Sequence, residues 1–279
     1  MLYVSSSSIR CTKITEAIDT LLSHGIDHIE LSGGSQYYDD LEKDLMERKK
    51  KDKVYFLLHN YFPPPPAAFV LNLASANLTI TSQSLEHIRR AISLSTLLGA
   101  DKYAFHAGFL IDPEPKELGE SIGFYHIQHG DEAKKRFMDN YKKIHPQAVK
   151  IYIENNVISQ NNYDTFGCNP FMLTSADDYF ALKKELDFSL LLDLAHLKVS
   201  CTVLGKNFTQ QAEMLLNETD YLHVSDNDGL HDTNNSLSAD SDVYAILKNA
   251  GLKEKTITLE IYEDIRKILQ TKELIEKLF

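Results

Sequence analysis

The chain alternates short apolar runs with longer amphipathic segments. Eight runs have the length of a buried strand and are rich in β-branched and aromatic residues; they lie near residues 2–5, 26–31, 54–59, 102–106, 150–154, 190–193, 220–224 and 256–260. The segments between them have a helical period. Strands that alternate with helices in this way form repeated βα units around a parallel sheet. The pattern therefore predicts eight βα units.

The clearest helical segment covers residues 81–98, in which Leu85, Ile88 and Ile92 follow a spacing of three and four and Gly99 supplies a C-terminal stop. The segment that begins at Tyr262 repeats the pattern and should close the ring. The chain has 279 residues, close to the roughly 250 of a typical (β/α)8 barrel. We therefore predict the α/β class, with residues 1–279 forming a single-domain (β/α)8 TIM barrel of parallel β-strands.

Three connections are too long for simple turns, and each follows a predicted strand. They run from residue 60 to about 80, from 108 to about 130, and from 155 to about 174. The first contains the run Pro63–Pro66, which cannot be helical and should be extended and stiff. Long loops over the mouth of a barrel usually form a lid or a substrate wall. We expect these three loops to determine substrate specificity.

Composition restricts the class of partner. The chain has 40 acidic and 29 basic residues and a net charge of −11, which disfavours nucleic acid, because phosphate contacts need clustered Lys and Arg. Cys11, Cys168 and Cys201 lack the spacing of a disulfide framework or a thiolate zinc site. No secretory signal pattern or membrane-length apolar stretch is present. We expect a soluble, cytoplasmic protein, either monomeric or paired through its helices as a homo-oligomer, with a small-molecule substrate.

Side chains that commonly bind metals stand at the downstream ends of six predicted strands. They are His59, His106, Glu154, Asp193, His223 and Glu260. Polar residues at these ends are where a parallel barrel keeps its chemistry. The last four supply three carboxylates and one imidazole, a set suited to Mn²⁺ or Zn²⁺, with Mg²⁺ and Co²⁺ as alternatives. The sequence therefore predicts a divalent metal ion bound by Glu154, Asp193, His223 and Glu260.

Other residues have less definite roles. His59 and His106 either bind a second metal ion or hydrogen-bond a substrate hydroxyl. His196, just beyond the sixth strand, binds a second metal ion, contacts substrate or orients its loop. Glu30, at the end of the second strand, either faces the site or caps the following turn. Lys198 is either a substrate contact for a phosphate or carboxylate, or an ordinary surface lysine. We carry Glu30 and Lys198 forward as candidate substrate-binding residues.

Several of these residues lie in motifs that resemble those of the endonuclease IV family. The run His59-Asn60-Tyr61-Phe62, followed by Asn72-Leu73-Ala74-Ser75, is similar to that family's His-x-Tyr and Asn-Leu-Ala-Ser element. The other motifs follow in the same order: His106-Ala107-Gly108, Ile153-Glu154-Asn155, Asp193-x-x-His196, His223-x-x-Asp226 and Leu259-Glu260. The wider group is the xylose-isomerase-like TIM barrels, which include sugar isomerases and ketose 3-epimerases. Together the motifs cover most of the chain.

The resemblance to the isomerases and epimerases implies that one divalent ion chelates the carbonyl and an adjacent hydroxyl of an open-chain sugar or sugar phosphate. Glu154 and Glu260 would then be the catalytic acid/base pair, which removes and returns a proton through a metal-stabilised enediolate. His196 would hold a substrate oxygen. On this basis we predict a metal-dependent sugar isomerase or epimerase.

The resemblance to the nuclease branch implies an alternative, a metal-dependent phosphodiesterase that acts on abasic-site DNA or on a small phosphate ester. That branch binds a cluster of three metal ions. The resemblance implies that the ligands of this cluster include His59, His106 and a later Asp-x-His pair. In this chain Asp232-Thr233-Asn234 occupies the position of that pair. Asp232 is therefore a candidate for a second metal or for substrate, but Asn234 replaces a metal-binding His, and an amide is a poor zinc ligand.

Overall fold

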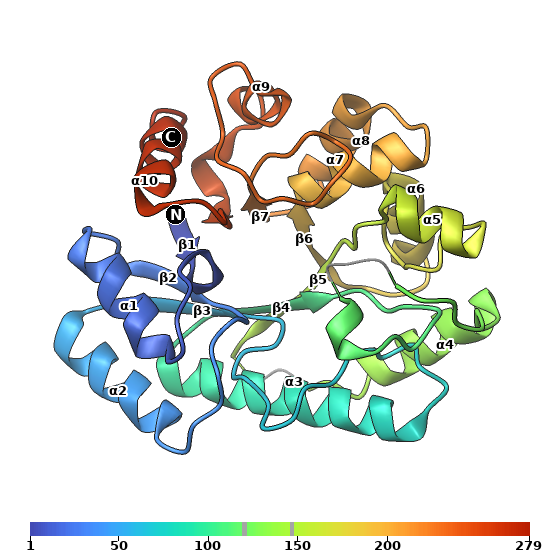
Figure 1. Ribbon diagram of the computed structural model, residues 1–279, viewed down its shortest axis with the longest axis horizontal. Coiled ribbons are helices and arrows are strands. Elements are labelled where there is room, and N and C mark those ends of the chain that lie inside the picture. The colour runs from blue at the N-terminus through green and yellow to red at the C-terminus, as the bar shows by residue number, and fades with distance from the viewer. Residues whose placement is uncertain (119–121, 146–147) are drawn as a thin grey trace.

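Eight parallel strands close into a barrel in sequence order in the computed structural model, which describes residues 1–118, 122–145 and 148–279 (Figure 1). The strands are β1 (Leu2–Ser5), β2 (His28–Leu31), β3 (Tyr55–His59), β4 (Lys102–His106), β5 (Lys150–Glu154), β6 (Ser189–Asp193), β7 (Tyr221–Val224) and β8 (Thr256–Leu259). Hydrogen bonds between β8 and β1 complete the ring. The predicted (β/α)8 barrel is confirmed.

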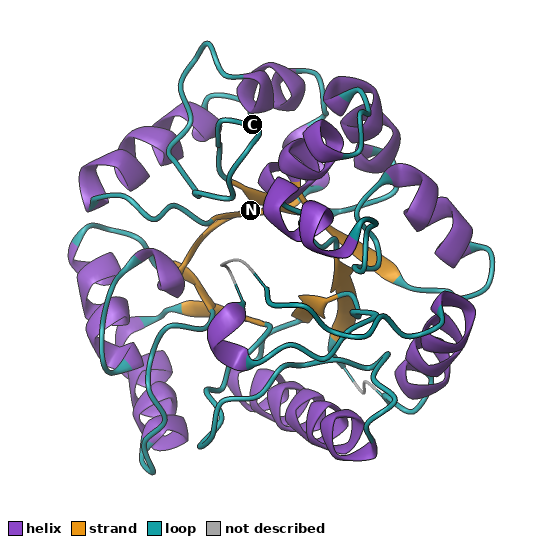
Figure 2. Ribbon diagram, turned by 45° about the vertical axis from the view of Figure 1, so that its right-hand side comes forward, coloured by secondary structure: helices purple, strands orange, loops and turns teal. Residues whose placement is uncertain are grey.

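Helices surround the ring of strands (Figure 2). They are α1 (Ile14–Ser23), α2 (Leu41–Asp52), α3 (Leu78–Leu98), α4 (Gly130–Tyr141), α5 (Gln160–Phe166), α6 (Ala176–Lys183), α7 (Leu194–Val203), α8 (Phe208–Leu216), α9 (Asp242–Lys248) and α10 (Ile265–Glu276), with 3₁₀ turns at η1 (Ser6–Ser8), η2 (Pro115–Glu117) and η3 (Leu252–Glu254). Within the described ranges, none of these helices has the length and apolarity that a membrane span needs.

The predicted element boundaries differ from the observed ones for local reasons. Helix α3 begins earlier than expected, at Leu78, because the Asn77 side chain caps it by accepting a hydrogen bond from Thr79 N. It ends at Gly99, which has a φ of 66°. Strand β2 begins at His28 and not at Ile26, because the Ile26 amide donates to Leu21 O in the turn that closes α1.

The packing inside the barrel determines where the strand-end side chains point. A separate buried cluster consists of Tyr3, Leu57, Ala104, Tyr152, Leu191 and Tyr221, each from a different strand. Side chains alternate between the two faces of a strand, so the residue two positions further along faces the same side. For the last five members that residue is His59, His106, Glu154, Asp193 and His223. The predicted metal ligands therefore form the next layer of the barrel interior.

The loops at the carboxyl ends of the strands pack on one another. A second apolar cluster joins the three long loops and consists of Val70, Phe109, Ile111, Ile122, Ile158 and Phe171. The loop after β5 is more regular than expected, because it contains α5, which is capped by the Ser159 side chain. Residues 119–121 of the predicted loop after β4 lie outside the described residues.

Asn72 fastens the proline-containing loop to the loop after β4. Its amide oxygen accepts from Ala74 N and Phe109 N, both at 3.0 Å, and its Nδ2 donates to Phe109 O, Ile111 O and Asp112 Oδ1 at 2.9–3.1 Å. Asn72 is fully buried. The Asn-Leu-Ala-Ser element thus has a structural role in joining two loops at the mouth.

Asn72→Ala should lower the free energy of unfolding by about 3 kcal/mol, because it leaves several buried backbone groups without partners and each costs roughly 1–3 kcal/mol before relaxation. Chemical denaturation followed by circular dichroism measures the change. Asn217→Ala is the matched control, because Asn217 is exposed and its amide makes one hydrogen bond, to Glu213 O at 3.1 Å. Equal stabilities for the two variants would contradict the fastening role.

Candidate metal centre

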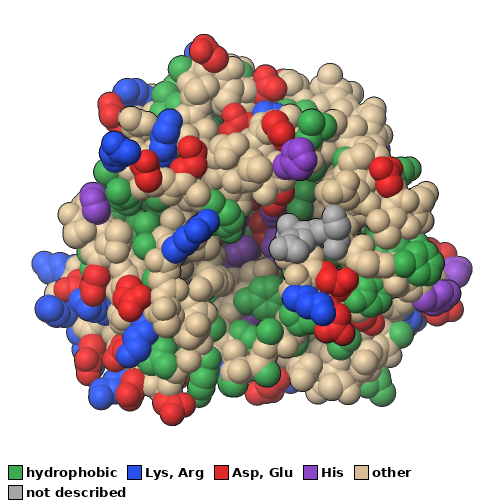
Figure 3. Space-filling model, in the orientation of Figure 1, with side chains coloured by type: hydrophobic (Ala, Val, Ile, Leu, Met, Phe, Trp, Pro, Cys, Tyr) green, Lys and Arg blue, Asp and Glu red, His purple; other side chains and the backbone are tan. Residues whose placement is uncertain are grey.

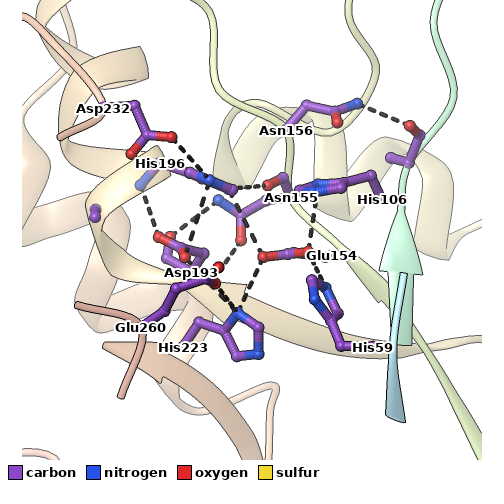
Figure 4. A network of polar contacts seen from close by, with 12 residues as sticks. His59, His106, Glu154, Asn155, Asn156, Asp193, His196, His223, Asp232 and Glu260 are labelled. Atoms are coloured by element: carbon purple, nitrogen blue, oxygen red, sulfur yellow. Dashed lines mark hydrogen bonds and ion pairs between the residues drawn. The ribbon is translucent and has the colours of Figure 1, made fainter. Parts of the chain in front are cut away.

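Histidine and carboxylate side chains from six strand ends and the loops beside them meet at the mouth of the barrel (Figure 4). They are His59, His106, Glu154, Asp193, His196, His223, Asp232 and Glu260. The surface is hollowed near the centre of the face drawn in Figure 3, and histidine and acidic side chains are visible inside the hollow. Strand register contributes to the convergence, since His106 pairs with Glu154 and Asp193 pairs with His223 on neighbouring strands.

Glu154 lies at the centre of the cluster, and its two oxygens face different histidines. Oε2 accepts a hydrogen bond from His59 Nε2 at 2.6 Å and lies 3.3 Å from His106 Nδ1. Oε1 lies 3.3 Å from His223 Nδ1 and 3.8 Å from His196 Nδ1. The side chain is fully buried. Glu154 therefore belongs to two groups of candidate ligands at once.

The first group consists of Glu154, Asp193 and His223, whose ligand atoms lie within 4.8 Å of one another, and the fourth predicted ligand, Glu260, approaches it at His223 Nδ1. Glu154 Oε1 and Glu260 Oε2 each lie 3.3 Å from this nitrogen, and Asp193 Oδ2 lies 3.9 Å from it. Two atoms that bind one ion at about 2.1 Å are separated by roughly 3.0–3.4 Å in octahedral or tetrahedral geometry. The three distances from His223 are close to this range.

The ligand atoms of the first group also have an environment that is suited to a cation. Glu154 Oε1 and His223 Nδ1 are buried and have no hydrogen-bond partner within the described part of the chain, and buried polar atoms without partners are costly unless an ion or water satisfies them. The second oxygen of Asp193 accepts from His196 N at 2.7 Å, which leaves Oδ2 to face His223. The chain's residues thus fit a divalent ion at this point.

Ser7 and Tyr262 orient the fourth ligand, Glu260. The Ser7 hydroxyl donates to Glu260 Oε1 at 2.9 Å, and the Tyr262 hydroxyl donates to the same oxygen at 2.7 Å. Glu260 Oε2 is thereby left to face His223. Neither contact was predicted from the sequence, because Ser7 stood within a run of serines and Tyr262 was assigned only to a helical pattern.

The second group of candidate ligands consists of His59, His106 and Glu154, whose ligand atoms lie within 4.8 Å of one another. The other ring nitrogen of His59 lies 3.2 Å from the Ser32 hydroxyl, which fixes the ring. His106 Nδ1 is buried without a hydrogen-bond partner. These residues could hold a second cation that shares Glu154 with the first.

His196 and Asp232 form a pair at the edge of the centre. His196 Nε2 lies 3.3 Å from Asp232 Oδ2, while His196 Nδ1 donates to Asn155 O at 2.9 Å. Among the described residues, this pair belongs to no group of three metal-binding side chains. Asn234 instead accepts a hydrogen bond from the Ser225 hydroxyl. His231, a histidine in the same loop after β7, lies against Asp228. Among the residues that the structure describes, none therefore supplies the third ligand that the nuclease resemblance requires here.

Burial and mutual contact shift the pKa values of the cluster in opposite directions. Burial raises the pKa of Asp193 to about 6, with Glu154 and Asp232 adding to the effect. Burial would also raise the pKa of Glu260, but the His223 imidazole beside it outweighs burial and lowers that pKa to about 2. Burial lowers the pKa of His106 to about 4. A pKa of about 4 leaves His106 uncharged at neutral pH, whereas the surrounding carboxylates outweigh burial and raise the pKa values of His59 and His223.

Asn155 joins the ends of two ligand-bearing strands. Its Nδ2 donates to Asp193 O at 3.0 Å, and its Oδ1 accepts from Asp193 N at 2.7 Å. Asn155 follows Glu154 directly, so this side chain holds Glu154 and Asp193 in a fixed relation. The sequence pointed to Asn155 only through the family motif and gave no reason for its presence.

The two candidate substrate-binding residues, Glu30 and Lys198, both make polar contacts within the protein. Glu30 is fully buried within the barrel, where its carboxylate contacts His223, Tyr221 and Thr258. Glu30 has no exposed surface, and its role in binding substrate stays a prediction. Lys198 donates hydrogen bonds to Asp226 Oδ1 and Asn227 O, both at 2.8 Å. These bonds engage its ammonium group in holding the loop after β7.

Solved structures of several enzymes have the same fold. A D-tagatose 3-epimerase-like protein is 20% identical, with a TM-score of 0.75, and the match covers 99% of this chain and 96% of that one. A D-psicose 3-epimerase from Clostridium cellulolyticum is 10% identical, with a TM-score of 0.68 and coverage of 99% and 98%. Endonuclease IV from Thermus thermophilus is 11% identical, with a TM-score of 0.59 and coverage of 99% and 98%.

A comparison with curated protein sequences found no match. A family model, in contrast, matches nearly the whole chain. It is described as xylose isomerase-like TIM barrel and covers residues 18–278. The closed parallel barrel and the histidine and carboxylate side chains at its mouth agree with this match. The chain belongs to the xylose isomerase-like TIM barrel family.

Proposed function

We propose that this protein is a divalent-metal-dependent epimerase or isomerase of a sugar or sugar phosphate. The observation that carries the proposal is the approach of Glu154 and Glu260 to one point, with each carboxylate 3.3 Å from His223 Nδ1. They come from distant parts of the sequence, at β5 and beyond β8. Several structural neighbours are named as ketose 3-epimerases or as a 3-epimerase-like protein, which supports a sugar substrate.

Glu154, Asp193, His223 and Glu260 would hold the ion, which when bound would supply Lewis-acid polarisation of a substrate carbonyl. The two glutamates would then act as base and acid. Epimerisation needs one group to remove a proton from a carbon and another to return it to the opposite face. Of the two side chains, Glu260 is 13% exposed and Glu154 is 1% exposed. Glu260 is therefore the carboxylate more accessible to a substrate that enters from solvent.

The test is solvent deuterium exchange with a panel of ketoses and ketose phosphates, read by mass spectrometry and NMR. We expect one deuterium to enter at the carbon beside the carbonyl, and Glu260→Gln to abolish the exchange. Glu263→Gln is the matched control, because that carboxylate lies three residues further on and accepts a hydrogen bond from Ser236 N. Exchange that proceeds equally in Glu260→Gln would refute its role as an acid or base.

A second candidate function is phosphoester hydrolysis, favoured by one specific observation. Glu154 faces His59 and His106 with one oxygen and His223 with the other, and two ions bridged in this way are common in enzymes that cleave phosphate esters. Two bound ions per chain, together with cleavage of abasic-site DNA or a small phosphate ester and no deuterium exchange, would establish this function over the first. The pair His196 and Asp232, which has no third metal-binding side chain beside it among the described residues, weighs against phosphoester hydrolysis.

A further inference from the structure

Glu30 is a buried carboxylate that the proposed reaction does not use. It extends from β2 into the barrel interior and has no exposed surface. Burying a carboxylate costs free energy unless its oxygens find partners. Glu30 Oε2 accepts hydrogen bonds from the Tyr221 hydroxyl and from Thr258 Oγ1, the latter at 3.0 Å. One oxygen is thus held by two neighbouring strands, β7 and β8.

The other oxygen of Glu30 faces the back of a candidate metal ligand. Glu30 Oε1 lies 2.9 Å from His223 Nε2, and neither atom makes a hydrogen bond with any described residue in this structure. The opposite nitrogen of the same ring, Nδ1, faces the carboxylates of the metal centre. His223 is fully buried, so its ring is enclosed between Glu30 on one side and the candidate ion site on the other.

Glu30 could instead be a metal ligand, because its ligand atoms lie within 4.8 Å of those of His59 and His223. The contacts of His59 argue against this role. Its Nε2 already donates to Glu154 Oε2 at 2.6 Å, and its Nδ1 lies 3.2 Å from the Ser32 hydroxyl. His59 therefore has no nitrogen directed to an ion beside Glu30.

We propose that Glu30 is a positioning residue for the metal centre. In this role Glu30 Oε1, which lies 2.9 Å from His223 Nε2, would accept the hydrogen of that nitrogen and so fix the tautomer in which the Nδ1 lone pair is free for an ion. A neutral imidazole has one N–H and one lone pair, and a carboxylate behind a ligating histidine selects which nitrogen carries each. Tyr221 and Thr258 hold Glu30 in register for this contact. The inference rests on the metal centre of the proposed function.

The test compares metal binding by the wild-type protein and Glu30→Gln, using Co²⁺ as the probe. A competition titration with a chromophoric chelator gives the dissociation constant, and the visible absorption of the bound Co²⁺ reports its ligand geometry. We expect Glu30→Gln to weaken Co²⁺ binding about 10–100-fold, the usual loss for such partners, and to change the absorption spectrum. Tyr221→Phe, which keeps the carboxylate, should have a smaller effect in the same direction.

Glu218→Gln is the matched control, because Glu218 also accepts a hydrogen bond from a tyrosine, Tyr179, at 3.2 Å, but does so outside the metal centre. Thermal melts followed by circular dichroism establish that each variant is folded. If the wild type binds Co²⁺ and folded Glu30→Gln binds it with the same affinity and spectrum, the positioning role is wrong and the metal centre stands. If the wild type itself binds no ion, both proposals fail together.

Discussion

Glu154→Gln is expected to lower kcat at least about 10³-fold while leaving the barrel folded. Gln has the same shape as Glu, but its amide nitrogen cannot bind a metal and its oxygen is a weak base. Loss of a positioned general base alone costs about 10²–10⁴-fold. The change also removes the charge that faces His59, His106 and His223, so metal content should fall as well.

The measurement is kcat on the substrate identified by deuterium exchange, together with metal content by mass spectrometry of protein purified without chelator. Glu263→Gln, in which the same chemical change is made outside the cluster, should retain both. Unchanged turnover in Glu154→Gln would remove Glu154 from the catalytic residues. Lost turnover with full metal content would show that Glu154 acts as an acid or base and is not required for metal binding.

Removal of metal is expected to abolish activity and to destabilise the protein. An ion present at about 1,000 times its dissociation constant contributes roughly 4 kcal/mol, which for a chain of this size corresponds to a shift in Tm on the order of 10 °C. Without a cation, Glu154, Asp193 and Glu260 would face one another around His223 with less charge to balance them.

Dialysis against a chelator followed by thermal melts and activity assays would measure both effects. Titration of Mn²⁺, Zn²⁺, Mg²⁺ or Co²⁺ into the stripped protein should restore them and would give the number of ions bound. One ion per chain would favour the epimerase or isomerase, and two would favour the phosphoesterase. Full activity in protein shown to be free of metal would exclude a metal-dependent reaction.

The barrel was predictable from the sequence because each strand leaves two local signals, an apolar run and a polar residue at its end. The same periodicity explains why the candidate ligands could be selected. Leu57 and His59, or Tyr221 and His223, lie two residues apart and so face the same interior. Knowing the strand ends was therefore enough to expect convergence, although the role of each side chain stays a prediction.

The partners of the ligands could not be predicted in the same way. Ser7 and Glu260 are 253 positions apart in the sequence. Such contacts depend on the depth of each side chain inside the ring. Sequence pattern gives the face of a strand on which a residue lies, but not the layer in which it meets residues from distant strands.

The side chain of Asn155 has a consequence for motion at the mouth of the barrel. Backbone pairing between β5 and β6 reaches Glu154 opposite Leu191, and the Asn155 amide then bonds both backbone groups of Asp193 as a peptide group of another strand would. This side chain extends the ladder beyond its last backbone pair. The amide hydrogen of Asp193 should consequently exchange with solvent as slowly as those of the barrel core, so that this seam opens only when the barrel itself unfolds.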